Sequence, residues 1–595
     1  MNMYRLLMGV HKLFPNISNK YKNNVIFTLN SINDSSQSKI NNLHELFLDA
    51  NCLLHPVSMK VYSEHKSLFI TNLPKLEFMM IEENIKYIEM LISLTKPSEL
   101  VYIAIDGVAP FAKNKQQYCR RYKSVHDNNM TKKFANKYNI PYEKPWNNSA
   151  ITPGTAFMDK IVNGVIQYLM IKQEQNKDNS HKIKYIFSSA YTPNEGEHKI
   201  LQYIRSNKLS VKNRAIYGLD ADLIYLSMAS NVESIFLMRE ITQFQHITSP
   251  DGFCFLSIDN LIIGIYDDIT KELVDDGYVV FPNLINYKSS IIMDYIFYGF
   301  MIGNDFLSNL PSVNLKFDKK HSGLSILNDA YRYSFSIINQ GKSENYIFLS
   351  SANEEFKINY DFLKEMLVYI VSFEESYFRD TFRFKKKIIT KPTTFEEEVK
   401  SYENMEFYVA DQFHLGHKAT PHEESKKLYY EYYGMQDINK VCEEYIGGLA
   451  WNGHYYFNEC QDFLWHYPYD KSPFVSDILE WLLSHREKFD EILNKYPLIK
   501  CNMGTISPLE QLLLVLPVQS AYLLPRQIKS KMLSNPDIFL TKFDLDLQDV
   551  HRMWQAKPKI PPPNIETCKS IIQNISLNND ELLRNTHRKI YEFMI

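Results

Sequence analysis

Between residues 45 and 230 the chain alternates short apolar runs with longer amphipathic segments. The apolar runs predict strands at 45–49, 100–106, 185–190 and 214–226. In the segments between them apolar residues recur every three or four positions, which predicts helices at 76–97, 152–170 and 197–205. Strands that alternate with helices at this spacing predict an α/β fold, with a parallel sheet covered by helices on both faces.

Beyond residue 435 the pattern becomes aromatic and helical, as in YIGGLAWNGHYYF (445–457). Residues 383–404 change from basic to acidic and contain a proline, which is typical of a surface connection. A chain of 595 residues is too long for one core. We therefore expect an α/β domain at 1–320, a helical connection with surface loops at 321–434, and a second, mainly helical domain at 435–595 that packs on the first.

Composition narrows the class of protein without identifying it. Hydrophobic residues make up 45% of the chain and charged residues 23%, and the net charge is only −3, so any nucleic-acid surface must be local. The seven cysteines form no CxxC pair, which argues against a disulfide framework or a structural zinc site. No apolar run approaches the roughly 20 residues of a membrane span, and the first residues do not resemble a signal peptide. We expect an intracellular monomer without a membrane; a cytoplasmic place is favoured, and a nuclear one stays open.

Acidic residues gather at the ends of the predicted strands. At or just after these ends stand Asp49, Asp106, Glu195, Glu197, Asp220 and Asp222, and Asp305 follows a Gly-Asn turn that would complete the set. A single acid at such a position is as often the N-cap of the next helix as a ligand. Several acids at neighbouring strand ends, where the sites of parallel sheets form, predict a shared cluster.

Crowded carboxylates repel one another unless cations neutralise them. Mg²⁺ or Mn²⁺ suits oxygen ligands, whereas the absence of HExxH and of a Cys/His set disfavours zinc. Two such ions about 4 Å apart can hold the attacking and leaving oxygens in phosphodiester hydrolysis. The chain has no GxxxxGK[ST] motif, so NTP-driven chemistry is not indicated.

An ordered series of motifs resembles the signatures of the eukaryotic 5′→3′ exoribonucleases, the XRN family. The motifs are LDANCLLH (48–55), DGVAPFAKNKQQYCRR (106–121), ITPGTAFM (151–158), NEGEHKI (194–200), YGLDADLI (217–224) and GNDFLSNLP (303–311). The resemblance continues through WHYPYDKSPFVSDI (465–478) and WQAKPKIP (554–561), and so covers nearly the whole chain. It implies a PIN- or flap-nuclease-like sheet, in a minimal version without the family's long C-terminal extensions.

The resemblance also implies roles for single residues. The implied metal ligands are Asp49, Asp106, Glu195, Glu197, Asp220, Asp222 and Asp305. The implied pocket for a 5′-phosphate consists of Lys113, Gln117, Arg120 and Arg121, and Lys113 would also neutralise charge near the metals. These four recur at helical spacing and would share one face of a helix. A run of charged residues like this one is more often a solvent-exposed helix face.

Two aromatic positions follow from the same resemblance. His55 stands where the family has a histidine that stacks on the first base, although a lone histidine is more often a core residue. Trp465 matches the second of two family tryptophans, and Phe463 stands at the first. Which of the two aromatics of this second domain reaches substrate stays open, because most aromatics in such a region belong to the core.

Three positions depart from the family pattern. Cys52 replaces a glycine after Asp-x-Asn, so the turn after the first strand should be altered. Asn194 replaces a glycine before Glu195, and asparagine tolerates a left-handed backbone. Phe111 replaces a basic residue ahead of Lys113, which removes positive charge near the implied phosphate pocket.

The resulting hypothesis is a processive 5′→3′ exoribonuclease. It would hydrolyse single-stranded 5′-monophosphorylated RNA to nucleoside 5′-monophosphates with two Mg²⁺ or Mn²⁺ ions, in RNA decay. One alternative is a flap-type, structure-specific DNA nuclease, which shares the sheet and the acids. Another is an inactive RNA-binding scaffold, which the presence of all seven acids disfavours. Protein partners are not predictable from these residues.

Overall fold

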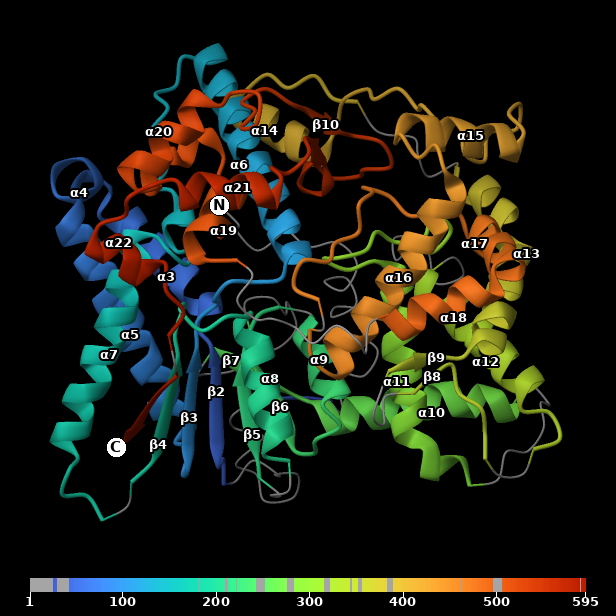
Figure 1. The fold of residues 1–595 in the computed structure, drawn as a ribbon, viewed down its shortest axis with the longest axis horizontal. Helices are drawn as coiled ribbons and strands as arrows, with labels where there is room; N and C mark the ends of the chain where they lie inside the picture. The colour runs from blue at the N-terminus through green and yellow to red at the C-terminus, as the bar shows by residue number, and fades with distance from the viewer. Residues whose placement is uncertain are drawn as a thin grey trace.

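The computed structural model describes residues 25–28, 42–180, 182–208, 212–220, 222–241, 252–275, 283–314, 322–342, 345–351, 356–382, 389–460, 462–495, 506–588 and 590–595. Within these ranges the chain forms one large sheet flanked by helices and a mainly helical, aromatic-rich second region (Figure 1). This confirms the predicted α/β class. No helix in the described ranges is both long enough and apolar enough to cross a membrane.

The central sheet has eight strands in the order β1-β7-β6-β5-β2-β3-β4-β12. Their bounds are Ile26–Thr28 (β1), Glu45–Asp49 (β2), Leu100–Ala104 (β3), Lys184–Ser188 (β4), Arg214–Tyr217 (β5), Ile235–Glu240 (β6), Phe253–Ser257 (β7) and Tyr591–Met594 (β12). The inner strands β6, β5, β2, β3 and β4 are parallel, as predicted. At the edges β7, β1 and β12 pair antiparallel with their neighbours, so the sheet as a whole is mixed. A parallel strand is usually preceded by a crossover helix, whose pattern helps to predict it. An antiparallel edge strand needs no such helix and lacks this signal.

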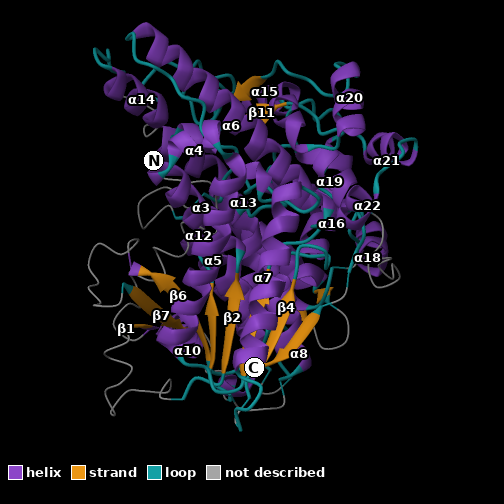
Figure 2. Cartoon of the chain, turned by 90° about the vertical axis from the view of Figure 1, so that its left-hand side faces the viewer, coloured by secondary structure: helices purple, strands orange, loops and turns teal. Residues whose placement is uncertain are grey.

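Side chains of the inner strands alternate between two hydrophobic cores. In β2, Phe47 belongs to one core, whereas Leu46 and Leu48 belong to the other. The first core is covered by α8 (Gly196–Ser206), α9 (Asp222–Ala229) and α10 (Ile258–Asp275), and the second by α3 (Asn51–Glu64), α5 (Leu73–Thr95) and α7 (Ala156–Gln175). Helices therefore cover both faces of the sheet, as the buried inner strands require (Figure 2).

Local signals set the ends of the predicted helices. The Asn72 side chain accepts a hydrogen bond from the Lys75 backbone N–H and caps the start of α5, and Lys96 ends that helix with a φ of +48°. The Thr155 hydroxyl accepts a hydrogen bond from the Met158 N–H and caps α7 in the same way. Both helices lie within a few residues of their predicted positions.

The fourth predicted strand is shorter than expected. We predicted a strand over 214–226, but β5 ends at Tyr217 and α9 begins at Asp222. Gly218 lies in the turn between them, where a Cβ would stand 2.5 Å from the Leu223 side chain. The prediction was wrong because the apolar residues after the turn belong to a helix. They pack into the core beside the sheet and are not part of the strand.

The remaining helices are concentrated in the C-terminal half. They are α4 (Lys66–Thr71), α6 (Phe111–Lys137), α11 (Lys288–Gly299), α12 (Gly323–Ile338), α13 (Tyr360–Phe382), α14 (Phe395–Asn404), α15 (His422–Tyr432), α16 (Ile438–Phe457), α17 (Val475–Ser484), α18 (Arg486–Lys495), α19 (Pro508–Val515), α20 (Arg526–Ser534), α21 (Ile565–Gln573) and α22 (Asn579–Arg584). Two small sheets pair β8 (Ser350–Ser351) with β9 (Lys357–Ile358) and β10 (Asp544–Asp546) with β11 (Lys557–Lys559). Of the predicted surface connection 383–404, residues 383–388 lie outside the described ranges, and α14 occupies its end.

The long helix α6 connects the two halves of the molecule. It leaves the carboxyl end of β3 and runs up among the C-terminal helices (Figure 1). The Phe111 N–H donates to the Phe463 carbonyl at 2.7 Å, Lys115 Nζ to the Tyr467 carbonyl at 3.0 Å, and the Tyr118 hydroxyl to the Pro561 carbonyl at 3.0 Å. The chain then returns to the first sheet, because β12 pairs with β4. The predicted domain boundaries did not anticipate this return, and they stay predictions.

Candidate active site

The strand order places several chain segments around one end of the sheet. The chain runs outward from β2 through β3 to β4, then returns to the other side of β2 with β5 and β6, so a topological switch point lies between β2 and β5. Crevices at the carboxyl ends of strands on either side of such a point are where α/β sheets bind ligands. Asp49 ends β2, Asp106 follows β3, and Asp220 follows β5. In Figure 2 the arrowheads of the inner strands point toward the half that contains α6 and α19.

Asp106 lies at the centre of a set of short contacts. Asn51 Nδ2 donates to Asp106 Oδ2 at 2.6 Å, and the Gly196 N–H donates to Asp106 Oδ1 at 2.7 Å. A Cβ on Gly196 would stand 2.8 Å from Asp49 Oδ1 and 3.3 Å from Asp106 Oδ1. The first turn of α8 therefore packs directly on two of the predicted ligands, and the glycine between Glu195 and Glu197 makes this approach possible.

Lys113 is the counter-ion of the acidic cluster. It is 7% exposed, and its Nζ lies 2.6 Å from Glu195 Oε1 and 2.7 Å from Asp305 Oδ2. Gln116 Nε2 donates to the other oxygen of Asp305 at 2.8 Å. Burial lowers the pKa of Lys113, but Asp305 and Glu195 more than reverse this, so the pKa lies well above its ordinary value. The lysine is thus a permanent cation among these carboxylates.

Lys113 and a second buried lysine, Lys199, which interacts with Asp106 and Asp49, are too few to neutralise seven acids. Burial, together with repulsion by neighbouring acids, raises the pKa of Asp49 and Glu197 well above the ordinary range, and burial and Asp305 raise that of Asp222 to about 8. Burial also raises the pKa of Asp106 and Glu195, although bound donors oppose it. Asp49 Oδ1 and Glu197 Oε2 are buried without a hydrogen-bond partner among the described residues. Buried carboxylate oxygens with raised pKa and free lone pairs fit a hard divalent cation.

The structure brings all seven predicted acids into one electrostatically coupled group. Asp49 interacts with Asp106 and Asp220, and Asp222 interacts with Asp305, Asp220 and Glu195. Ligand atoms of Asp49 and Asp220, with Cys52, lie within 4.8 Å of one another, and so do those of Glu195, Glu197 and His198. Their role as metal ligands stays a prediction, but their convergence is a property of the fold.

The predicted phosphate-binding residues divide between two places. Lys113 contacts the acids, whereas Arg121 lies two helical turns further along α6. Arg121 Nη2 donates to Gln117 Oε1 at 3.2 Å and to Thr152 Oγ1 at 3.0 Å. Among the described residues, its buried Nη1 has no hydrogen-bond partner, and no acidic side chain forms an ion pair with Arg120 or Arg121. Burial, then the nearby Arg120, lower the pKa of Arg121 to about 9. Because its Nη1 is buried and unused, Arg121 is suited to donate a hydrogen bond to an anion.

His55 interacts electrostatically with both the arginine pair and Asp220. Burial, followed by Arg120 and Arg121, lowers the pKa of His55 to about 4, and Asp220 opposes the shift. Its ring is therefore neutral near neutral pH, and its Nδ1 has no hydrogen-bond partner among the described residues. A neutral ring at this place suits base stacking better than it suits ion pairing.

The second-domain aromatics form a stack that leads to the acids. Trp465 is half-buried and stacks on Trp451 with ring centroids 4.7 Å apart, and Trp451 stacks on Tyr455 at 4.8 Å. The Tyr455 hydroxyl donates to Glu195 Oε2 at 2.5 Å. Phe463 is buried. No ring contact within the described residues joins Trp465 to His55, so its contact with substrate stays a prediction.

Sequence reasoning missed four residues of the site: Asn51, Gln116, Thr152 and Tyr455. Each is uncharged; Asn51, Gln116 and Thr152 stand inside motifs of the family resemblance, and Tyr455 stands in the aromatic segment 445–457. Their positions in those motifs were the only available signal, because hydrogen-bond partners far apart in sequence follow only from the fold.

The three departures from the family pattern have structural consequences. Asn194 has a φ of +88°, the left-handed backbone expected of a glycine replacement. The Phe111 and His466 rings meet edge-on with centroids 4.6 Å apart. An aromatic contact between the two halves therefore replaces the basic residue that the family has at this position. Cys52 is the second residue of α3, so the strand is followed directly by a helix.

Comparisons with known proteins agree with this geometry. The family model described as "XRN 5'-3' exonuclease N-terminus" matches residues 8–241, and the one described as "Xrn1 helical domain" matches residues 416–594. The 5'-3' exoribonuclease 1 of Homo sapiens is 27% identical over 98% of this chain and 35% of its own length. The 5'-3' exoribonuclease 2 of Arabidopsis thaliana is 26% identical over 93% of this chain and 65% of its own length.

A third relative, the 5'-3' exoribonuclease 1 of Schizosaccharomyces pombe, is 26% identical over 93% of this chain and 47% of its own length. The chain thus spans between 35% and 65% of the length of these three relatives. Both domain models match in the order in which the sheet and the helical half occur along the chain. The chain belongs to the XRN family.

Proposed function

We propose that this protein is a processive 5′→3′ exoribonuclease that releases nucleoside 5′-monophosphates from single-stranded RNA with a 5′-monophosphate. One observation carries the proposal. Helix α6 carries both Lys113, which pairs with a cluster of carboxylates in excess of its cations, and Arg121, whose buried Nη1 has no partner among the described residues. Lys113 and Arg121 are eight residues apart, which is about 12 Å along a helix axis. Such a pairing suits a substrate that carries a terminal phosphate close to its scissile bond.

The acidic cluster would hold two Mg²⁺ or Mn²⁺ ions. Asp49, Asp106, Glu195, Glu197, Asp220, Asp222 and Asp305 supply oxygen ligands only, the donor type that these ions prefer. When bound, the ions would supply Lewis acidity to the scissile phosphate and to its attacking water. Lys113 forms ion pairs with Glu195 and Asp305, and Asn51 and Gly196 fix the orientation of Asp106.

The arginine pocket would select the 5′ end. Arg121 offers its free Nη1, and Arg120 adds a second, exposed guanidinium beside it. Gln117 and Thr152 orient Arg121 through its other nitrogen. A terminal monophosphate would fill the vacant hydrogen-bonding position, whereas a 5′-hydroxyl or a cap would not.

Kinetics on matched substrates test this role. We expect kcat/KM to be far higher for 5′-monophosphate RNA than for 5′-hydroxyl or capped RNA of the same sequence. Arg121→Gln should lower it for the 5′-monophosphate substrate by about 10- to 100-fold, because a charged hydrogen bond contributes about 1.5–3 kcal/mol. The same variant should leave the slow reaction with 5′-hydroxyl RNA unchanged.

Arg379→Gln is the matched control, since Arg379 is an exposed residue of α13. Equal rates on 5′-monophosphate and 5′-hydroxyl RNA in the wild type would remove the pocket from the account. Faster cleavage of a matched DNA strand would favour a flap-type DNA nuclease instead.

A further inference from the structure

Lys199 is a buried lysine that the proposed chemistry does not use. It lies in the first turn of α8, is 4% exposed, and forms no ion pair in the described part of the chain. Its Nζ donates to the Ile105 carbonyl at 2.7 Å and to the Ser189 carbonyl at 2.9 Å. These two carbonyls directly follow β3 and β4, so the lysine joins the ends of two neighbouring strands.

The peptide between Ile105 and Asp106 is held by side chains, because it lies beyond the last paired residues of β3 and β4. Its carbonyl accepts from Lys199, and its N–H donates to Asn51 Oδ1 at 3.2 Å. No other donor among the described residues contacts the Ile105 carbonyl. Since a buried carbonyl without a partner is unfavourable, Lys199 fixes the peptide from which the Asp106 side chain projects.

The second carbonyl belongs to the loop 189–194, which leads to the acids at the start of α8. This loop pairs with the segment that follows Asp106. The Gly107 N–H donates to the Asn194 carbonyl at 2.9 Å, and the Asn194 N–H donates to the Val108 carbonyl at 2.8 Å. One lysine therefore holds the beginning of two paired segments, each of which carries predicted metal ligands.

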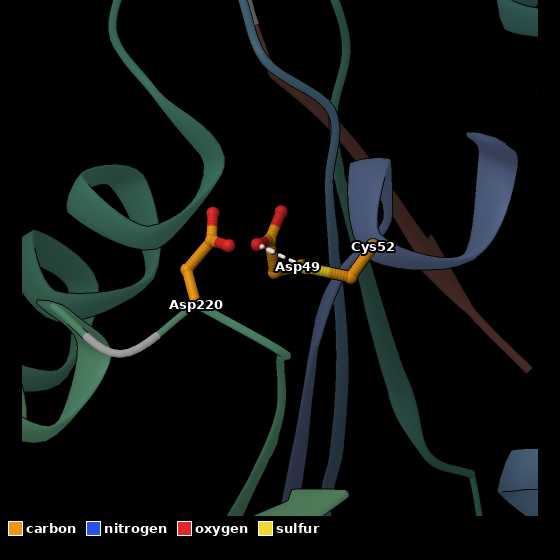
Figure 3. Close-up of side chains that lie close together, drawn as sticks. All are labelled: Asp49, Cys52 and Asp220. Atoms are coloured by element: carbon orange, nitrogen blue, oxygen red, sulfur yellow. Dashed lines mark hydrogen bonds between the residues drawn. The ribbon is translucent and has the colours of Figure 1, made fainter. Parts of the chain in front are cut away.

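Lys199 differs from Lys113 in the atoms that it contacts. Lys113 Nζ contacts carboxylate oxygens, whereas the described hydrogen bonds of Lys199 Nζ go to backbone carbonyls. Lys199 still interacts electrostatically with Asp106 and with Asp49, whose carboxyl group lies beside that of Asp220 in Figure 3. Burial lowers the pKa of Lys199 to about 7, and Asp106 and Asp49 oppose the shift. The two hydrogen bonds do not require the charge, because a neutral amine keeps two N–H groups.

We propose that Lys199 is a positioning residue that holds the ends of β3 and β4 together and so aims Asp106 and the first turn of α8 at the predicted metal site. This inference rests on the proposed function, because the aim of Asp106 affects the reaction only if the acids hold catalytic ions. The arrangement consists of protein groups alone, so it holds before any ion binds. None of the described contacts of Lys199 involves the predicted phosphate pocket on α6.

Hydrogen exchange of the full chain in EDTA, read by peptide mass spectrometry, tests this arrangement in the wild type. The amides of Asp106, Gly107 and Asn194 all donate hydrogen bonds. Peptides over 104–108 and 188–196 should therefore be nearly as protected as those over β3 and β4. Protection that appears only after Mg²⁺ is added would overturn the proposal, because the ions would then order these segments.

Lys199→Met removes both hydrogen bonds while it keeps a long apolar side chain. It should raise the exchange rate of the same two peptides about 10-fold or more and leave α13 unchanged. It should also lower kcat on 5′-monophosphate RNA by about 10- to 100-fold, with KM nearly unchanged. The ratio of kcat/KM between 5′-monophosphate and 5′-hydroxyl RNA should stay that of the wild type, because the phosphate pocket is untouched.

Lys426→Met is the matched control. Lys426 is 6% exposed in α15 and pairs with Asp477, so its replacement also removes a buried lysine and should keep kcat. Wild-type kcat in a folded Lys199→Met variant, or an equal loss in Lys426→Met, would overturn the proposal. If Lys199→Met does not fold, the wild-type exchange pattern still decides it. A wild type with the expected protection that cleaves no RNA in Mg²⁺ would overturn the proposed function and leave the structural arrangement in place.

Discussion

At the scale of single residues, burial decides the chemistry of the acids. Asp49 and Asp222 carry the same side chain as any exposed aspartate, yet burial and neighbouring charge raise the pKa of both. The sequence predicted which acids converge, because strand ends in a parallel sheet meet at one edge. It could not predict Asn51 or Gln116, because an amide carries no charge pattern that distinguishes a ligand-orienting role from a surface one.

Replacing Asp220 tests the predicted metal role directly. Asp220→Asn removes one ionised oxygen at nearly constant volume, so hydrolysis should fall by about 100-fold or more, because a bound ion supplies several kcal/mol of charge stabilisation. RNA binding and the unfolding transition should change little. The measurement is single-turnover cleavage beside a binding titration, with the exposed Asp178→Asn as control. Full activity in Asp220→Asn would refute the role.

The raised pKa of Asp222 predicts how stability depends on pH. The value rises from 3.8 to about 8 on folding, so between these limits the folded state binds a proton that the unfolded state has released. The free energy of unfolding of the metal-free protein should therefore fall as pH rises through this window, by about 1.4 kcal/mol per pH unit for one such proton. Mg²⁺ favours the ionised carboxylate, so it should raise Tm more at about pH 8 than at about pH 6.

Calorimetry in EDTA and in Mg²⁺ measures both effects. Asp222→Asn is the control and should make the metal-free slope shallower. A metal-free Tm that increases from about pH 6 to about pH 8, to the same extent in both proteins, would contradict the assignment.

At the scale of elements, two helices organise the site. α6 brings Lys113 to the acids and Arg121 to Thr152 in the predicted phosphate pocket, and the cation run predicted that helix correctly. Helical spacing alone did not place Lys113 among the acids, because it fixes a face but not a partner; the family resemblance implied that placement. α16 brings Tyr455 from the helical half to Glu195, a contact between residues 260 positions apart that periodicity cannot reveal.

The Tyr455 contact yields a prediction about α16. Tyr455→Phe removes the hydroxyl that holds Glu195 Oε2 while keeping the ring stacked on Trp451. A hydrogen bond to a charged group contributes about 1.5–3 kcal/mol, so kcat should fall about 10-fold or more with KM for RNA nearly unchanged.

Tyr445→Phe on the same helix is the matched control, because its hydroxyl makes only a 3.5 Å contact with the Ser308 carbonyl. Steady-state kinetics at saturating Mg²⁺ provide the comparison. Equal losses in the two variants would mean that α16 acts through general packing and not through Glu195.

At the scale of the whole molecule, the helical half completes the sheet half. Contacts along α6 and the stack that ends at Tyr455 place residues of the C-terminal half directly against the acids. The order of strands and helices up to β5 was predictable from periodicity. The antiparallel edge strands were not, because β12 has four residues and alternates half-buried with exposed positions, a weak apolar pattern.

The most direct test of the account is the fate of the first nucleotide of an RNA. Single-stranded RNA labelled at its 5′-monophosphate is incubated with the full chain, with Mg²⁺ or with EDTA, and the labelled products are separated by size. The account predicts that with Mg²⁺ the label appears from the earliest time as a nucleoside 5′-monophosphate, and that with EDTA the RNA stays intact. Label in oligonucleotides of intermediate length, or equal degradation in EDTA, would contradict it.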